Sequence, residues 1–207
     1  MTITVLFCHS VCQWPVTESR TVQQTVEMLT RRIEVLGAVK AGNFCVDCET
    51  YQSTQTINST KLVHLMHNSE QPLTCFGITD TGACLITDGQ FEGIMQKLKG
   101  FYTPRKSARV ESKGQRFELG DFLVKIGIVS IGPHTKGILV EVEYTPCIVV
   151  PDCWNLLHEF MQSFMGNQSP SLPTTLLSKQ DMPVTPIDTM VQYLEHFNNF
   201  KKGSAGR

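Results

Sequence analysis

Residues 121–150 constrain the fold more than any other stretch, because apolar residues recur at every second position along two successive arms. These positions are Phe122, Val124, Ile126 and Ile128 in the first arm and Ile138, Val140, Val142 and Tyr144 in the second. A period of two is typical of strands with one buried face, and Gly132, Pro133 and Gly137 predict a turn between the arms. The pattern therefore predicts a long antiparallel hairpin that the rest of the chain must cover.

The composition is that of an ordinary globular protein, with 41% hydrophobic residues among 207 and a formal net charge of −1. Such a small charge argues against attraction to nucleic acid or to an anionic membrane. The apolar runs are shorter than the roughly 18 residues that a membrane span needs, and no basic residue precedes Arg20, as a signal peptide would require. Eight cysteines then indicate thiols in a reducing compartment. We expect a soluble, intracellular protein without direct sequence-specific nucleic-acid binding.

Helix signals recur outside the hairpin. Thr21 begins a capping-box pattern, and the apolar stripe that follows it predicts a helix ending at Gly37. Start signals at Asp88, Asp152 and Thr185 predict three further helices.

Short strands are predicted at 3–7, 43–51, 61–67, 73–79 and 82–87, with a further hairpin in 109–119 that turns at 112–115. Irregular structure is predicted at 8–16, 52–60 and 102–109, a mobile connection at 167–184 and a frayed tail at 201–207. Strands and helices do not alternate regularly, which argues against a doubly wound parallel sheet. We expect an α+β fold over residues 1–207 as a single domain: a curled antiparallel β-sheet or barrel of about eight strands with flanking helices.

Glu141 and Glu143 form the one credible catalytic pair. Two carboxylates at i and i+2 share one face of a strand, and triphosphate-tunnel hydrolases line a barrel with Glu-x-Glu-x-Lys strands that hold metal and polyphosphate. Here Thr145 stands where that lysine would be, and the basic residues on neighbouring predicted strands are Lys113, Arg116 and Lys125. We favour the alternative that both glutamates face solvent while Val140, Val142 and Tyr144 face the core, because unpaired charges are rarely buried. We therefore assign no catalytic, cofactor-binding or metal-binding residues.

Cys45 and Cys48 have the spacing of a metal or redox pair. In a strand, however, residues three apart point to opposite faces, so ordinary buried thiols are the favoured interpretation.

The histidines show no converging pattern. His64 and His67 are three apart in one predicted strand, whereas His158 and His196 lie in predicted helices. The basic group Arg105, Lys106 and Arg109 is interpreted as a solvated loop rather than a nucleic-acid footprint.

Several segments taken together resemble the Mediator complex subunit 20 family, which belongs to the head module of the RNA polymerase II coactivator. They run in order along nearly the whole chain: VQQTVE (22–27), FCVDCETY (44–51), MHNSE (66–70), KLKGF (97–101), DFLVKIG (121–127), VEVEYTPC (140–147), DCW (152–154) and DTMVQY (188–193).

The resemblance implies a curled sheet or barrel with flanking helices, and a nuclear, non-enzymatic subunit. It also implies pairing with Mediator subunit 18 and contact with other head-module subunits, without a cofactor. The alternative is a metal-dependent triphosphate hydrolase that uses Glu141 and Glu143. The family's motifs fall on predicted strands and helices, so no catalytic residue is carried over.

Overall fold

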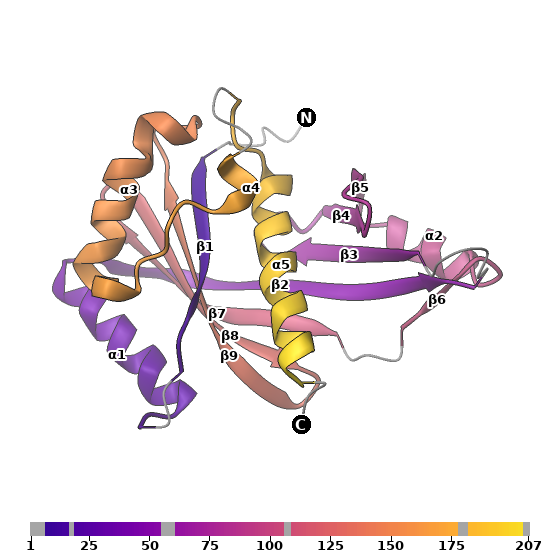
Figure 1. The fold of residues 1–207 in the computed structure, drawn as a ribbon, viewed down its shortest axis with the longest axis horizontal. Coiled ribbons are helices and arrows are strands. Elements are labelled where there is room, and N and C mark those ends of the chain that lie inside the picture. Colours follow the sequence, from indigo (N-terminus) through magenta and orange to yellow (C-terminus); the bar gives the residue numbers. More distant parts are fainter. Residues whose placement is uncertain (1–6, 17–18, 55–60, 106–108, 178–181, 205–207) are drawn as a thin grey trace.

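The computed structural model describes residues 7–16, 19–54, 61–105, 109–177 and 182–204 (Figure 1). Within these ranges the strands are β1 (Cys8–Trp14), β2 (Val39–Ser53), β3 (Leu62–Asn68), β4 (Thr74–Thr79), β5 (Cys84–Asp88), β6 (Tyr102–Pro104), β7 (Val110–Leu119), β8 (Phe122–Ile131) and β9 (His134–Tyr144). The helices are α1 (Val22–Val35), α2 (Phe91–Lys97), α3 (Val150–Met165), the 3-10 turn η1 (Gly166–Gln168), α4 (Thr174–Leu177) and α5 (Pro186–Ser204). No helix in the described ranges has both the length and the apolar character to cross a membrane.

All strands belong to one antiparallel sheet in the order β1-β9-β8-β7-β2-β3-β4-β5, and β6 pairs with the end of β2. Helix α5 contacts β1 at one end of this order and β4 near the other end, so the sheet curls around the helix (Figure 1). In the described part of the chain the sheet does not close into a barrel. The expected α+β class and curled antiparallel sheet are confirmed.

The predicted central hairpin is present as β8 and β9, paired from Phe122 with Tyr144 to Ile131 with His134. Gly132 adopts a positive φ of 57° at the turn. The turn is tighter than the sequence predicted, because residues 134–137 already belong to β9. The pairing register shifts between Val129 and Ser130, where β9 has one more residue than β8.

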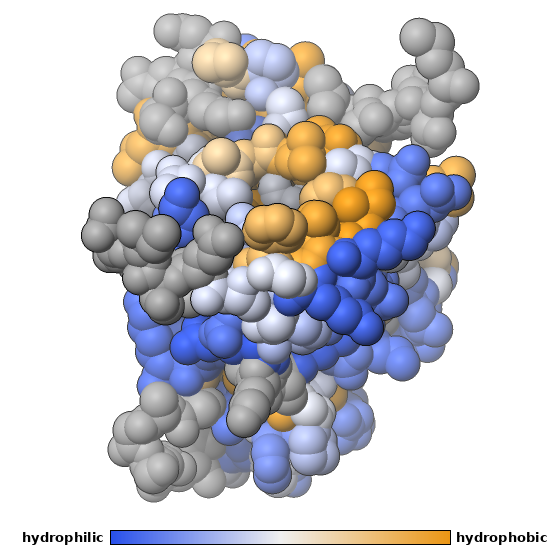
Figure 2. Space-filling model, turned by 90° about the vertical axis from the view of Figure 1, so that its right-hand side faces the viewer, coloured by the Kyte–Doolittle hydropathy of each residue, from blue (hydrophilic) through white to orange (hydrophobic). Residues whose placement is uncertain are grey.

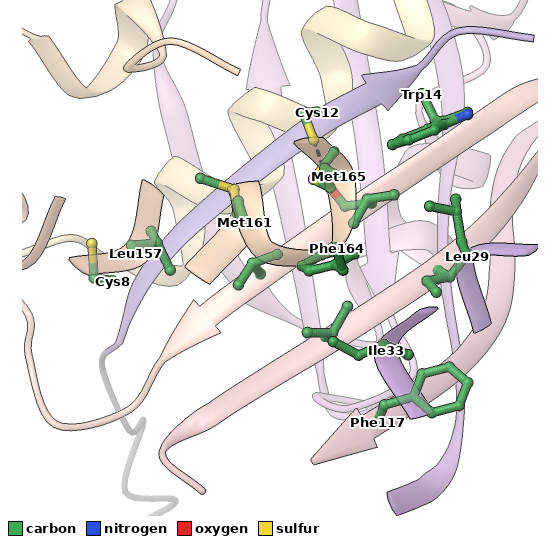
Figure 3. Close-up of a cluster of buried hydrophobic side chains, with 14 of the residues drawn as sticks. Cys8, Cys12, Trp14, Leu29, Ile33, Phe117, Leu157, Met161, Phe164 and Met165 are labelled. Atoms are coloured by element: carbon green, nitrogen blue, oxygen red, sulfur yellow. Dashed lines mark hydrogen bonds between the residues drawn. The ribbon is translucent and has the colours of Figure 1, made fainter. Parts of the chain in front are cut away.

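Helices α1 and α3 cover one face of the sheet. Thr21 forms the predicted capping box with Gln24 at the start of α1, and Gly166 ends α3 with a φ of 60°. Their apolar stripes meet Val124, Val140 and other residues of the central hairpin. Figure 3 shows the centre of this core, with Leu29, Ile33, Met161, Phe164 and Met165 from the helices and Cys12, Trp14 and Phe117 from the strands.

Helix α5 covers the opposite, concave face, where its side chains pack on the strands from β1 to β4. The apolar contacts of α5 come from Met190, Tyr193, Leu194, Phe197 and Phe200. A smaller cluster packs α2 through Met95 against Tyr51, Leu65 and Cys75. Both faces of the central strands are therefore buried.

Two predicted irregular or turn segments are strands instead. Residues 8–14, expected to be irregular, form β1, in which Cys8, Cys12 and Trp14 face the α3 side as small or aromatic core residues. Residues 112–115 were expected to turn but lie inside the continuous strand β7. A Cβ at Gly114 would lie 1.8 Å from the carbonyl oxygen of Ile126, so this glycine permits a close approach of two backbones rather than a turn.

Other expectations need smaller corrections. Residues 102–104 pair with β2, although Pro104 suggested a loop, and Gln52 and Ser53 extend β2. The segment 167–184 begins within η1 and contains α4, and Leu176 and Val184 are buried in it; its mobility stays a prediction. Helix α5 continues through residues 201–204 of the predicted tail. The strand predicted at 3–7 lies, apart from residue 7, outside the described residues, as do 55–60 and 178–181.

Candidate functional site

A cluster of charged side chains is buried on the concave face beneath α5. Lys125 of β8 and Glu141 and Glu143 of β9 expose only 2%, 1% and 4% of their surface. The pairing of β8 with β9 places Lys125 directly opposite Glu141. Strand alternation then puts all three side chains on the same side of the sheet.

The prediction that Glu141 and Glu143 face solvent is wrong. It correctly placed Val140 and Val142 in the core beneath α1 and α3, but it assumed that the other face of β9 was open. That face is covered by α5, and Leu139 packs in the core between α5 and the sheet. Charges become tolerable there because they are paired.

The Lys125 ammonium lies at the centre of the cluster. Its Nζ is 3.3 Å from Oε1 of Glu141 and donates a hydrogen bond to Glu143. It also forms an ion pair with Glu70, a residue just beyond β3. Glu70 in turn forms an ion pair with Arg116 of β7 at 2.8 Å, so the network reaches from the buried hairpin to the partly exposed Arg116.

His9 and Tyr193 complete the surroundings of the carboxylates. His9 of β1 places Nδ1 3.1 Å from Glu141 Oε1 and 3.6 Å from Glu143 Oε1. The Tyr193 hydroxyl of α5 donates to Glu141 Oε2 at 2.7 Å. Glu141 is thereby held by three different elements: the central hairpin, the edge strand and the covering helix.

The charge states follow from these contacts. Burial alone would raise the pKa of Glu141, but Lys125, His9 and Tyr193 outweigh it and lower the pKa. Burial raises the pKa of Glu143, with a contribution from the charge on Glu141 that Lys125 only partly offsets. Burial alone would lower the pKa of Lys125, yet Glu141, Glu143 and Glu70 together raise it. Lys125 and Glu141 are therefore both charged near neutral pH.

The structure brings together two of the basic residues that a triphosphate site would require. Lys125 and Arg116 join the cluster, whereas Lys113 alternates onto the α1 side and is exposed. His9, Glu70 and Tyr193 were missed by sequence reasoning. Tyr193 lies three residues after Met190 and four before Phe197, the spacing of one face of a helix, and this is a sequence signal for its burial.

A cation site can be imagined from His9, Glu141 and Glu143, whose ligand atoms lie within 4.8 Å of one another. The Lys125 ammonium already supplies the positive charge between these carboxylates. A divalent ion would have to displace Lys125, and a triphosphate would have to displace α5. As folded, the arrangement neutralises buried charge and fastens α5 to the sheet.

The cysteine pair does not converge. Cys48 is buried in the core beneath α5, and Cys45 lies three positions earlier in β2, on the opposite face, with its thiol free. Burial raises the pKa of Cys48 to about 11, which leaves the thiol protonated and unreactive.

The histidines of β3 have separate partners. His64 Nδ1 is 3.0 Å from the hydroxyl of Thr50, and burial, aided by Lys201, lowers its pKa to about 4. His67 Nδ1 is 3.3 Å from Asp47, and that bond raises its pKa to about 10. Asp47 also pairs with Arg109 at 2.6 Å.

The remaining predicted sites are also dispersed. His158 lies on α3, where its ring stacks on Trp154, and His196 Nε2 lies 3.0 Å from the Val11 carbonyl oxygen. Arg109 belongs to the Asp47 ion pair and Arg105 is exposed. Lys106, the third residue of the basic group, lies outside the described residues.

Comparison with known proteins identifies the family. Residues 1–198 match the family described as "TATA-binding related factor (TRF) of subunit 20 of Mediator complex". The chain is 52% identical over 196 residues to "Mediator of RNA polymerase II transcription subunit 20" of Gallus gallus and 51% identical over 197 residues to that of Homo sapiens; each match covers 93% of both chains. Among solved structures, the PH1012 protein from Pyrococcus horikoshii OT3 is 12% identical with a TM-score of 0.47, covering 81% of this chain and 96% of that chain. The resemblance seen in the sequence is confirmed: this chain belongs to the Mediator subunit 20 family.

Proposed function

We propose that the chain is a structural subunit of the Mediator coactivator that supports RNA polymerase II transcription in the nucleus and carries no catalytic activity. Family membership is the observation that carries this proposal, because the relatives that match most of the chain are named as Mediator subunits.

The buried cluster supports a role without catalysis. Glu141 and Glu143 are nearly inaccessible, and each is engaged by at least one charged or hydroxyl group of the protein. An active site for polyphosphate would need these groups exposed to solvent and open to a metal. Here they join β8, β9 and α5.

The partner that we propose is Mediator subunit 18, within the head module. This choice follows from the family resemblance, and exposed apolar residues on both α1 and β5 provide surface for protein contacts. A stable pairing should bury more than roughly 2,000 Å² in total.

Coexpression with subunit 18 tests the pairing. We expect a stoichiometric complex in size-exclusion chromatography with mass measurement, and incorporation of that complex into a reconstituted head module. Separate elution of the two proteins at micromolar concentration, with both folded by circular dichroism, would refute the pairing.

A triphosphate hydrolase is the second candidate, because Glu141, Glu143, Lys125 and Arg116 do gather on one sheet face. It requires α5 to leave that face. Phosphate release from ATP or GTP with Mg²⁺ or Mn²⁺ should then depend on Glu143 and vanish in Glu143→Gln, but persist in Glu118→Gln, whose side chain is exposed. Absence of turnover above the Glu143→Gln background eliminates this candidate.

A further inference from the structure

The two edge strands of the sheet, β1 and β5, differ in whether their outward backbone groups are covered. At the β1 end, the Val11 N–H donates to Oε1 of Gln192 at 2.9 Å, and the Val11 carbonyl oxygen lies 3.0 Å from Nε2 of His196. Both side chains come from α5, so this helix occupies the outer hydrogen-bonding groups at the middle of β1. That edge is blocked against another strand.

The β5 end has no comparable cover in the described part of the chain, where β5 pairs with β4 alone. Leu85 pairs with Gly77 and Thr87 with Cys75. The bonds from Thr79 N–H to the Ala83 oxygen and from Gly89 N–H to the Leu73 oxygen set which pairs of this ladder are hydrogen-bonded. Because bonded pairs alternate in antiparallel strands, Leu85 and Thr87 bond to β4 and the backbone groups of Ile86 point outward.

Apolar side chains surround this outward edge. Leu85 and Ile86 expose 50% and 57% of their surface on the two faces of β5, and Leu73, Ile94 and Phe101 are exposed in neighbouring segments. Figure 2 looks onto the side of the molecule that lies at the right of Figure 1, and shows apolar residues gathered in one area bordered by hydrophilic ones. Exposed edge strands are commonly protected by charged side chains, especially lysine, or by proline; Cys84–Asp88 contains no lysine or proline, and its one charged residue is Asp88 at the end.

The local charge indicates what fits there. The β4–β5 hairpin, residues 74–88, carries Asp80 and Asp88 and no lysine or arginine, whereas Glu92 and Lys97 follow on α2 and Lys99 comes after it. Asp80 in the turn before β5 and Asp88 at its end are therefore the charges nearest to the strand in the sequence. A second copy of this chain would bring the same negative charge to the same edge, which disfavours self-pairing.

From the open edge, its apolar flanks and its acidic border, we infer that β5 accepts an extended strand of a partner protein, with apolar residues at alternate positions and at least one lysine or arginine. Backbone hydrogen bonds along Ile86 provide the affinity and the apolar and charged side chains provide the selectivity. This inference rests on the proposed function, since the partner is sought within the Mediator assembly.

Hydrogen exchange measured by mass spectrometry tests the inference on the full chain, free and in Mediator purified through a tag on the chain. We expect the Ile86 amide to exchange at least about tenfold more slowly in the assembly than in the free chain. The Leu85 and Thr87 amides should be protected in both, because β4 already binds them.

Ile86→Lys places a charge on the edge and should reduce recovery of the assembly at least about fivefold, whereas Met182→Lys, a change at an exposed apolar residue before α5, should not. Equal melting temperatures of both variants show that folding is retained. Exchange at Ile86 that is equally fast in the assembly and the free chain overturns the inference, as does concentration-dependent protection in the free chain, which indicates self-pairing. Failure of the chain to enter any Mediator assembly refutes the proposed function itself and is seen before exchange is measured.

Discussion

Lys125 and Glu141 face each other across β8 and β9, with Nζ 3.3 Å from Oε1, beneath a helix that also bonds Glu141 through Tyr193. A buried ion pair contributes little net stability when complete, but removal of one partner is costly. Helix α5 is linked to this pair through Tyr193, so displacement of the helix would remove the hydrogen bond to Glu141 and expose the apolar face beside it.

Lys125→Met should lower the free energy of unfolding by about 3–5 kcal/mol, because it leaves Glu141 and Glu143 buried without their cation. The loss should be smaller at pH 5 than at pH 8, since protonation can neutralise the stranded carboxyl groups. Urea unfolding at both pH values measures the effect. Lys113→Met, whose side chain is exposed on the α1 side of β7, should change stability by less than about 0.5 kcal/mol; equal effects of the two substitutions would contradict the structural role of Lys125.

Tyr193→Phe removes the hydroxyl that donates to Glu141 and leaves the ring packed against Phe197. The expected loss is about 1.5–3 kcal/mol, the range for a hydrogen bond to a charged group. Tyr144→Phe, on β9 and half-buried, is the matched control and should be nearly neutral in thermal unfolding. If the two variants have the same melting temperature, Tyr193 does not anchor α5.

Gly114→Ala should destabilise the protein by about 3 kcal/mol or more, because its methyl group would meet the Ile126 carbonyl oxygen and the backbones of β7 and β8 would have to separate. Gly93→Ala, inside α2 and facing open space, should instead stabilise by about 0.5–1 kcal/mol. Denaturant midpoints of the two variants must move in opposite directions.

The neighbouring histidines of β3 should titrate far apart. His64 has a pKa of about 4 because burial and Lys201 disfavour its charge, and His67 a pKa of about 10 because Asp47 stabilises its charge. A raised folded-state pKa means that the contribution of His67 to stability is complete below pH 6.5 and is lost as the pH rises through about 10. NMR titration of ring carbons checks both values, and His67→Gln should flatten the decline in stability between pH 7 and pH 10. If His64 and His67 both titrate near pH 6.5, the buried environment of His64 and the ion pair of His67 are both contradicted.

The hairpin, the capped start of α1 and the glycine end of α3 could be predicted because their signals are local. The period of two in residues 122–131, the capping box at Thr21 and the glycine after α3 each depend on neighbouring residues alone. Strand β1 was missed because cysteine, serine and histidine hid its alternation, and the continuity of β7 was missed because Gly114 resembled a turn residue.

The burial of Glu141 and Glu143 could not be predicted in the same way. It depends on α5, about fifty residues later in the sequence, and on Lys125 and Glu70 from two other parts of the sheet. The rule that unpaired charges avoid the core was sound, but the partners that satisfy it become neighbours only in the folded chain.

Purification of the chain, tagged at its natural locus, from nuclei under mild conditions tests the central claim most directly. Quantitative mass spectrometry should recover Mediator subunits in near-stoichiometric amounts, with subunit 18 retained at salt concentrations that strip weaker components. A tagged Lys125→Met variant should recover fewer Mediator subunits, and the decrease should match the decrease in the amount of folded variant. Recovery of the folded wild-type chain without Mediator subunits would contradict the claim.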